Sequence, residues 1–353
     1  MALSTKPARL VSPNLAPADD GEPPETATWR HALKTAIRDP AELCRVLELP
    51  DALVPTARKA AEMFGLFAPH GYVARIRKGD VDDPLLRQIL PLGDELLEVA
   101  GFTADPVDDD AAQLVPGLLQ KYQSRVLLIT TGACAIHCRY CFRRHFSYSE
   151  APHSLVQWQP ALDAIAADPT IDEVILSGGD PLTLVDGVLE PLIRRLEAIP
   201  HLRRLRVHTR LPIVIPERVC ESLLAWFSLT GTRLTPVCVL HANHAAELDE
   251  AVAAACVRLR HAGVLLLNQA VLLRGVNDSV DALDALSRRL LDLGVTPYYL
   301  HQLDRVAAAA HFEVPEDEGL RLVEALQTGL PGYGMPRYVR EIAGKRSKTP
   351  LHF

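Results

Sequence analysis

The sequence predicts an α/β fold in which six strand–helix units form an open, partial barrel behind a helical N-terminal lobe. Between residues 126 and 328, short apolar runs of strand length alternate with helical stretches, a pattern typical of a parallel sheet with helical connections. Before that region the apolar residues recur only at helical spacing. Because a closed barrel of this kind takes eight units, six units predict one that stays open.

The chain divides into four segments by composition and periodicity. Residues 1–27 are rich in Pro, Ala and Asp without periodicity and predict a flexible tail. Residues 28–105 predict the helical lobe, residues 106–330 the barrel, and residues 331–353 a separate C-terminal segment. Within the lobe, Pro40 begins a helix, since proline is favoured in the first helical turn.

Polar residues follow each predicted strand. The predicted strands are residues 126–129, 174–176, 205–207, 237–240, 265–271 and 297–300, and the helices are residues 155–167, 190–199, 216–227, 245–262, 280–293 and 316–328. The first strand leads into the loop that begins at Cys134. The polar residues at or after the ends of the other five strands are, in order, Gly178, Gly179 and Asp180; His208 and Arg210; His241; Asn268 and Gln269; and His301 and Asp304. Ligands of parallel α/β folds bind at the carboxyl ends of the strands, so this rim is the predicted active site.

Composition excludes several classes of protein. The net charge of −7 argues against a nucleic-acid-binding surface, which needs an excess of basic residues. No apolar run reaches the 18 residues of a membrane span, and the prolines at 7, 13 and 17 argue against a signal peptide. We therefore expect a cytoplasmic protein. Seven cysteines in 353 residues do not predict a disulfide scaffold, and four of them lie scattered in apolar surroundings.

The other three cysteines, Cys134, Cys138 and Cys141, form a C-x3-C-x2-C group directly after the first strand. Three thiolates can bind three irons of a 4Fe–4S cluster and leave the fourth iron open for chemistry. A structural zinc usually takes four ligands in paired groups, and only His137 or His145 lies nearby as a fourth. Chance packing cysteines are disfavoured by the polar residues of this loop. The spacing favours the cluster.

This cysteine group resembles that of the radical S-adenosylmethionine (SAM) enzymes, and the string from Cys134 to Arg144, ending Cys-Phe-Arg-Arg, resembles the lysine 2,3-aminomutase family. The resemblance implies a (β/α)6 partial TIM-type barrel with a 4Fe–4S cluster, SAM and pyridoxal 5'-phosphate (PLP). It implies conversion of (S)-α-lysine to (R)-β-lysine through a 5'-deoxyadenosyl radical, with lysine held as a PLP aldimine. An external electron donor would reduce the cluster. The family's glycine motif, matched by Gly178, Gly179 and Asp180, contacts the amino group of SAM.

The resemblance also implies roles for residues outside the cysteine loop. Arg125 matches an arginine near the PLP, Arg143 one that binds the substrate α-carboxylate, and Asp304 the aspartate that meets the substrate ε-ammonium. Arg144, next to Arg143, is the alternative that faces solvent. We assign His208, Arg210, Asn268 and Gln269 at the rim to cofactor binding. The family has a second aspartate seven residues before its PLP lysine, where this chain has Glu341, a departure that bears on substrate preference.

Lys348, followed by Thr349 and Pro350, matches the lysine that forms the internal aldimine with PLP. Lys345 is the competitor and lacks the following x-Pro. The short C-terminus resembles the branch of the family that makes β-lysine for elongation factor P, where a separate ligase attaches it. Two other hypotheses remain: a radical enzyme that acts on a peptide or glutamate without PLP, and a non-enzymatic zinc or cluster module.

Overall fold

A ten-stranded sheet organises the molecule, with its strands in chain order from β1 to β10. The computed structural model describes residues 24–148, 152–230 and 233–352. The strands are β1 Gln113–Val115, β2 Leu118–Tyr122, β3 Arg125–Thr131, β4 Glu173–Gly178, β5 Arg204–Thr209, β6 Thr235–Leu240, β7 Leu265–Val271, β8 Thr296–His301, β9 Arg337–Arg340 and β10 Thr349–Pro350. Strands β3 to β9 run parallel, whereas β1, β2 and β10 pair antiparallel at the two edges.

The six predicted strands are confirmed as β3 to β8, and the sheet is not closed, because among the described residues it ends at β1 and β10 without a pairing between them. The C-terminal segment supplies a further parallel strand, β9, which the sequence did not reveal. It has four residues, Arg337 to Arg340, with an arginine at each end, so only Tyr338 and Val339 are left and they are too few to form a recognisable apolar run.

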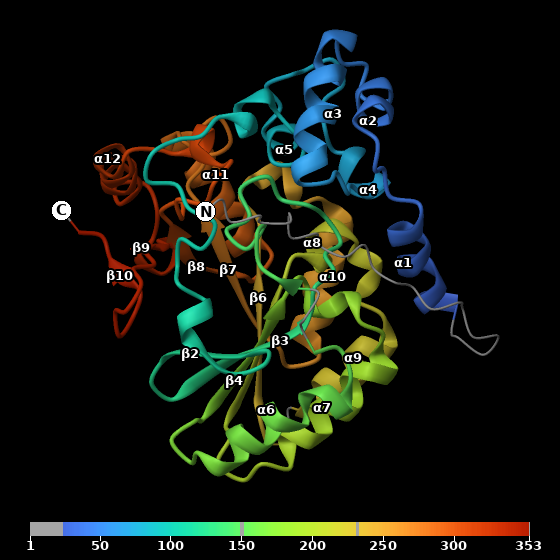
Figure 1. Ribbon diagram of the computed structural model, residues 1–353, viewed down its shortest axis with the longest axis vertical. Coiled ribbons are helices and arrows are strands. Elements are labelled where there is room, and N and C mark those ends of the chain that lie inside the picture. Colours follow the sequence, from blue (N-terminus) through green and yellow to red (C-terminus); the bar gives the residue numbers. More distant parts are fainter. Residues whose placement is uncertain (1–23, 149–151, 231–232, 353) are drawn as a thin grey trace, which may run out of the picture.

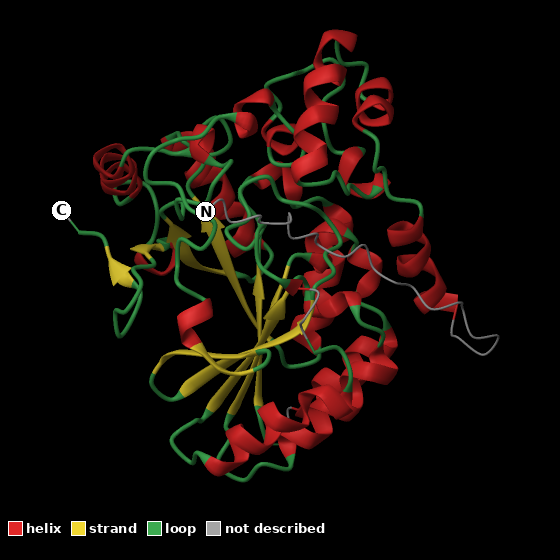
Figure 2. Cartoon of the chain, viewed as in Figure 1, coloured by secondary structure: helices red, strands yellow, loops and turns green. Residues whose placement is uncertain are grey.

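Helices cover the outer face of the sheet (Figures 1 and 2). They are α6 Leu155–Ala167, α7 Asp186–Glu197, α8 Leu211–Val214, α9 Glu221–Thr230, α10 Glu250–His261, α11 Val280–Asp292 and α12 Glu316–Leu326. Helix α11 shows why: its buried positions Leu283, Leu286 and Leu290 recur at helical spacing and face the sheet. The helix predicted over residues 190–199 begins earlier, at Asp186. That predicted over 216–227 is interrupted after Arg218 and resumes at Glu221.

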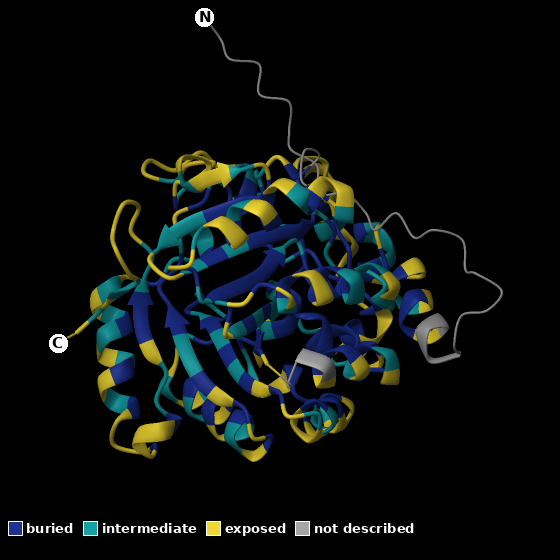
Figure 3. Ribbon diagram, turned by 90° about the horizontal axis from the view of Figure 1, so that it is seen from below, coloured by how far each residue is buried: buried dark blue, intermediate teal, exposed yellow. Residues whose placement is uncertain are grey.

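The N-terminal helices pack above the carboxyl ends of the parallel strands, except the first, which lies at the side of the barrel (Figure 1). They are α1 Pro24–Lys34, α2 Pro40–Val46, α3 Val54–Met63, α4 His70–Val73 and α5 Pro84–Arg87. Helix α1 begins inside the predicted tail, and residues 1–23 lie outside the described residues. Trp29, Leu33 and Phe67 of these helices and their connections belong to the same buried cluster as the barrel core. The sheet lies in the buried interior and the exposed residues lie on the outer turns of the helices (Figure 3).

Strands β5 and β7 alternate between two environments. In β7, Leu266, Asn268 and Ala270 are buried, whereas Gln269 and Val271 are half-buried and line the interior of the barrel. Because successive residues of a strand point to opposite faces, one face packs on the helices and the other is free to form a site. Within the part of the chain that the structure describes, no helix is long and apolar enough to cross a membrane.

Candidate active site

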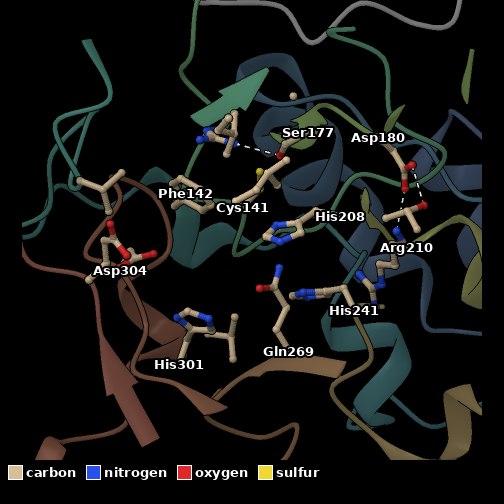
Figure 4. A pocket seen from close by; sticks show the side chains of 18 of the residues that line it. Cys141, Phe142, Ser177, Asp180, His208, Arg210, His241, Gln269, His301 and Asp304 are labelled. Atoms are coloured by element: carbon tan, nitrogen blue, oxygen red, sulfur yellow. Dashed lines mark hydrogen bonds between the residues drawn. The ribbon is translucent and has the colours of Figure 1, made fainter. Parts of the chain in front are cut away.

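A cavity of about 310 Å³ lies inside the barrel at the carboxyl ends of the parallel strands, and Figure 4 shows it from close by. Fourteen of the fifteen residues to which the sequence analysis assigned a role line it: Arg125, Cys134, Cys138, Cys141, Arg143, Gly178, Gly179, Asp180, His208, Arg210, Gln269, Asp304, Glu341 and Lys348. Asn268 is the exception. It is 2% exposed and bonds the backbone of Ala242 in both directions, at 2.9 and 3.0 Å.

The three cysteines line the cavity as free, half-buried thiols. Burial raises the pKa of Cys141 to about 11 and that of Cys134 well above its usual range, so both are protonated unless a metal displaces the proton. Among the described residues, no three His, Cys, Asp or Glu side chains converge on the position of one metal ion. A cube attaches each thiolate to a different iron, so its ligands need not converge on one point. The donor set fits a 4Fe–4S cluster.

The N-terminal lobe fixes the cysteine loop. Backbone N–H groups of His137 and Arg139 donate to the carbonyls of Phe67 and Gln88 at 3.0 and 2.9 Å. The Arg139 side chain, fully buried, binds Glu95 through two nitrogens at 2.6 and 2.8 Å. The lobe therefore acts as the support of the loop.

The structure separates the two adjacent arginines. Arg143 lines the cavity and donates to Asp109 at 2.6 Å and to Ser177 at 3.3 Å. Arg144 is 2% exposed and pairs with Glu95 at 2.7 Å. The expectation that Arg144 faces solvent is therefore wrong, and Arg143 is the arginine available to a ligand.

The glycine turn fits tightly against the cysteine loop. Gly178 has a φ of +123°, and the N–H of Gly179 donates to the Thr131 carbonyl at 2.7 Å. A Cβ on Gly179 would overlap the backbone carbonyl of Ala133, so only glycine fits. The Asp180 carboxylate, 5% exposed, accepts from the Thr209 hydroxyl and the Arg210 N–H at 2.7 Å each. Asp180 thus ties the end of β4 to the end of β5.

Arg210 and His241 join one polar network around the cysteines, through Gln88 and Tyr140. Arg210 donates to Cys138 Sγ at 2.7 Å and pairs with Glu247 at 2.7 Å. His241 lies 2.8 Å from the Tyr140 hydroxyl, and burial lowers its pKa to about 3, so the imidazole is neutral. The Nε2 atom of buried His208 has no hydrogen-bond partner within the described residues. Figure 4 shows His208, His241 and Gln269 between Arg210 and Asp304. These neutral polar groups are available to a ligand.

Lys348 lies in the cavity among acidic and aromatic groups. Lys348 Nζ lies 2.7 Å from Glu341 and 5.9 Å from the centre of the Tyr299 ring. Lys345 is exposed and does not line the cavity. The Asp304 carboxylate has no hydrogen-bond partner among the described residues, and burial raises its pKa to about 7. Arg125 lies over the Tyr122 ring at 4.8 Å.

Several residues of the site were not predicted. Asp109 pairs with Arg143 and, at 2.7 Å, with Lys121, while Tyr122 bonds Glu341. Asp109 lies in the acidic run from Asp105 to Asp110. In the sequence this run indicates only the boundary between the lobe and the barrel. His241 and His301, in contrast, were predicted at the rim from their positions in or after two strands, and both line the cavity, but no motif assigned either of them a role.

Comparison with known proteins identifies the family. Residues 128–286 match the model of the radical SAM superfamily. The chain is 47% identical to the L-lysine 2,3-aminomutase of Escherichia coli over 93% of this chain and 95% of that protein. It is 45% identical to that of Haemophilus influenzae over 92% and 96%, and 34% identical to that of Clostridium subterminale over 92% and 77%.

Radical SAM aminomutases use a 4Fe–4S cluster, SAM and PLP, and the cavity holds side chains suited to each. The cysteines can bind the cluster. The Gln269 amide and the His208 Nε2 atom, which has no hydrogen-bond partner in the described part of the chain, line the same cavity, as do the amine of Lys348 and the guanidinium of Arg125. The chain is an isomerase and belongs to the L-lysine 2,3-aminomutase family of radical SAM enzymes.

Proposed function

We propose that this chain converts (S)-α-lysine to (R)-β-lysine. The observation that supports this most directly is the combination of charges in one cavity, which is lined by Arg143 of the cysteine loop, Asp304 after β8 and Lys348 before β10. A lysine substrate has a carboxylate at one end and an ammonium at the other, so it complements a cavity lined by a guanidinium and a carboxylate from different elements.

Each end of the substrate has a proposed partner. The guanidinium of Arg143 binds the α-carboxylate with its planar fork, beside the bond it already makes to Asp109. The Asp304 carboxylate accepts the ε-ammonium, which relieves the cost of a half-buried charge with no other hydrogen-bond partner among the described residues.

Lys348 is the proposed attachment point of PLP, with Arg125 near its phosphate and the rim residues of β4, β5 and β7 near SAM. When bound, the cluster with SAM supplies hydrogen-atom abstraction, and PLP supplies a covalent carrier for the amino group. The residues of the chain orient the substrate between Arg143 and Asp304, and the barrel with its lobe excludes water from the cavity.

We further propose that the product β-lysine is used by a ligase that modifies elongation factor P. The family resemblance of the C-terminal segment around Lys348 supports this. The cytoplasm is the proposed compartment, since an oxygen-sensitive cluster and unpaired thiols need reducing conditions, and an external donor there would reduce the cluster.

Anaerobic incubation with labelled α-lysine, SAM, PLP and dithionite tests the proposal. We expect (R)-β-lysine as the labelled product. Cleavage of SAM to 5'-deoxyadenosine without labelled β-lysine would instead indicate a different radical reaction. Adding elongation factor P and its ligase then tests the assignment of the product: acid hydrolysis of the modified elongation factor P should release labelled β-lysine, and release of labelled α-lysine alone would contradict it.

Replacing Lys348 tests the PLP site separately. Lys348→Ala should abolish the pyridoxyl group that borohydride fixes to the chain, while iron and sulfide content stay unchanged. Lys345→Ala is the matched control, since Lys345 is exposed on the same loop, and should retain the fixed group. If peptide mapping finds the pyridoxyl group on Lys345, the assignment of Lys348 is wrong.

A further inference from the structure

Glu341 is held by the protein itself, although its position in the sequence corresponds to a substrate-binding aspartate of the family. Its Oε2 lies 2.7 Å from Lys348 Nζ, and its Oε1 accepts from the Tyr122 hydroxyl at 2.6 Å. Lys121 Nζ lies 3.9 Å from the same Oε1. Both carboxylate oxygens therefore already have partners, and the Glu341 side chain is only 10% exposed.

The backbone brings Glu341 and Lys348 together. Strands β9 and β10 form a hairpin in which Arg340 pairs with Thr349 and Val339 with Pro350. Continuing this register by one residue places Glu341 opposite Lys348 at the end where the loop begins. Opposite residues of an antiparallel pair have neighbouring side chains, so their ion pair follows from the register.

Asp304 differs from Glu341 in every one of these respects. It lies after β8 and faces the same cavity, but its carboxylate has no hydrogen-bond partner among the described residues. Burial raises the pKa of Asp304, whereas Lys348 and Tyr122, acting against burial, hold the pKa of Glu341 below its ordinary value. Of the two carboxylates, Asp304 is the one that gains from an added cation.

We propose that Glu341, supported by Tyr122, is a positioning residue that holds the Lys348 side chain for PLP, and that Asp304 alone binds the side-chain ammonium of the substrate. The proposal rests on the proposed function, in which Lys348 is the attachment point of PLP. Lysine has a long flexible stem whose ordering costs free energy, and a fixed carboxylate reduces that cost before the cofactor binds.

The length of the glutamate side chain is part of the inference. An aspartate at position 341 would end about 1.5 Å closer to the backbone, one C–C bond shorter. It could not keep both the 2.6 Å bond to Tyr122 and the 2.7 Å bond to Lys348 with the backbone in place. The extra methylene group of glutamate therefore allows one carboxylate to bind both Tyr122 and Lys348.

The test measures PLP binding to the resting, cluster-loaded chain without lysine, by titration with PLP and borohydride fixation. We expect Glu341→Gln to weaken PLP binding and slow fixation by about tenfold, the scale of one lost charge-assisted bond, and Tyr122→Phe to have a smaller effect in the same direction. The KM for lysine should change little in Glu341→Gln, whereas Asp304→Asn should raise the KM and leave PLP binding unchanged.

Arg340→Gln is the control for a merely structural effect. Arg340 lies on β9 beside Glu341 but pairs with Glu316 at 2.8 Å, so its loss weakens the same strand without touching Lys348. Normal PLP binding in this control with weak binding in Glu341→Gln supports the proposal. The proposal is overturned if both variants lose PLP equally, or if Glu341→Gln binds PLP normally and raises only the KM for lysine. Failure of the unaltered chain to fix PLP would instead contradict the proposed function.

Discussion

Single residues of the cavity differ mainly in whether the protein already satisfies their charge. Asp109 and Glu341 face cations at 2.7 Å or less and keep lowered pKa values, that of Asp109 being about 2. Asp304 has no such partner, and burial raises its pKa to about 7. Of these three carboxylates, Asp304 is therefore the one available to bind a cation of the ligand, and this is the basis for the proposed lysine specificity.

This difference predicts a pH dependence of lysine binding. The ionised form of Asp304 binds an ammonium, and ionisation occurs as pH rises through about 7, so the affinity for lysine should increase between pH 6 and 8. In Asp304→Asn the affinity should be lower, by about tenfold or more at pH 8, and should lose most of this dependence. Equilibrium binding of lysine to the PLP-loaded chain measures both. A steep rise that persists in Asp304→Asn would assign the titration to another group.

At the scale of elements, the glycine turn after β4 and the cysteine loop after β3 form one unit. The N–H groups of Gly179 and Asp180 donate to the carbonyls of Thr131 and Ala133, both at 2.7 Å. These bonds, with the absence of a side chain on Gly179, set the position of the first cysteine. The glycine turn therefore has a packing role in addition to the cofactor contact that the sequence suggests.

Gly179→Ala should accordingly disturb the cluster. The added Cβ would overlap the Ala133 carbonyl, so the cysteine loop must move, at a cost of about 1–3 kcal/mol or more. We expect reduced iron and sulfide content after anaerobic reconstitution and a lower unfolding temperature. Gly187→Ala, in α7, is the control because nothing lies within 4 Å of the added Cβ, and it should bind iron normally. Equal iron content in the two variants would contradict the packing role.

For the whole molecule, the N-terminal lobe and the barrel meet at the cysteine loop through Glu95. This carboxylate, 2% exposed, pairs with Arg139 at 2.6 Å and Arg144 at 2.7 Å. Both guanidinium groups lie over the Phe64 ring at 4.8 and 4.6 Å. The buried ion pairs of Glu95 with Arg139 and Arg144 therefore couple the lobe to the cysteine loop, because removal of either charge leaves the other buried without a counter-ion.

Glu95→Gln should destabilise the iron-free chain by about 3–5 kcal/mol, since it leaves two buried cations without a counter-ion. Urea unfolding measures the loss. Glu318→Gln, which breaks the more exposed pair with Arg274, should cost less than about 1 kcal/mol. If the two variants lose similar stability, Glu95 does not link the lobe to the barrel in the way described.

Local patterns in the sequence were enough for the strands β3 to β8 and for most of the cavity lining. Buried strands require apolar runs, and the polar residues that follow them must meet at one edge of a parallel sheet, so both are visible along the chain. Strand β9 and the edge strands β1, β2 and β10 were not visible, because each is short and contains at most two consecutive apolar residues. Asn268 was misplaced because neighbouring residues of a strand face opposite sides, and the sequence of β7 does not say which side faces the cavity.

By itself, the sequence located the cysteine group, the glycine turn and the strands β3 to β8, since each depends on residues close together in the chain. Tertiary structure alone decided that Arg143 and not Arg144 faces the cavity, that Asp180 ties β4 to β5, and that Glu341 holds Lys348 while Asp304 lacks a partner. The physical reason is that these outcomes depend on side-chain direction and strand register. Both are set by contacts between segments far apart in the sequence.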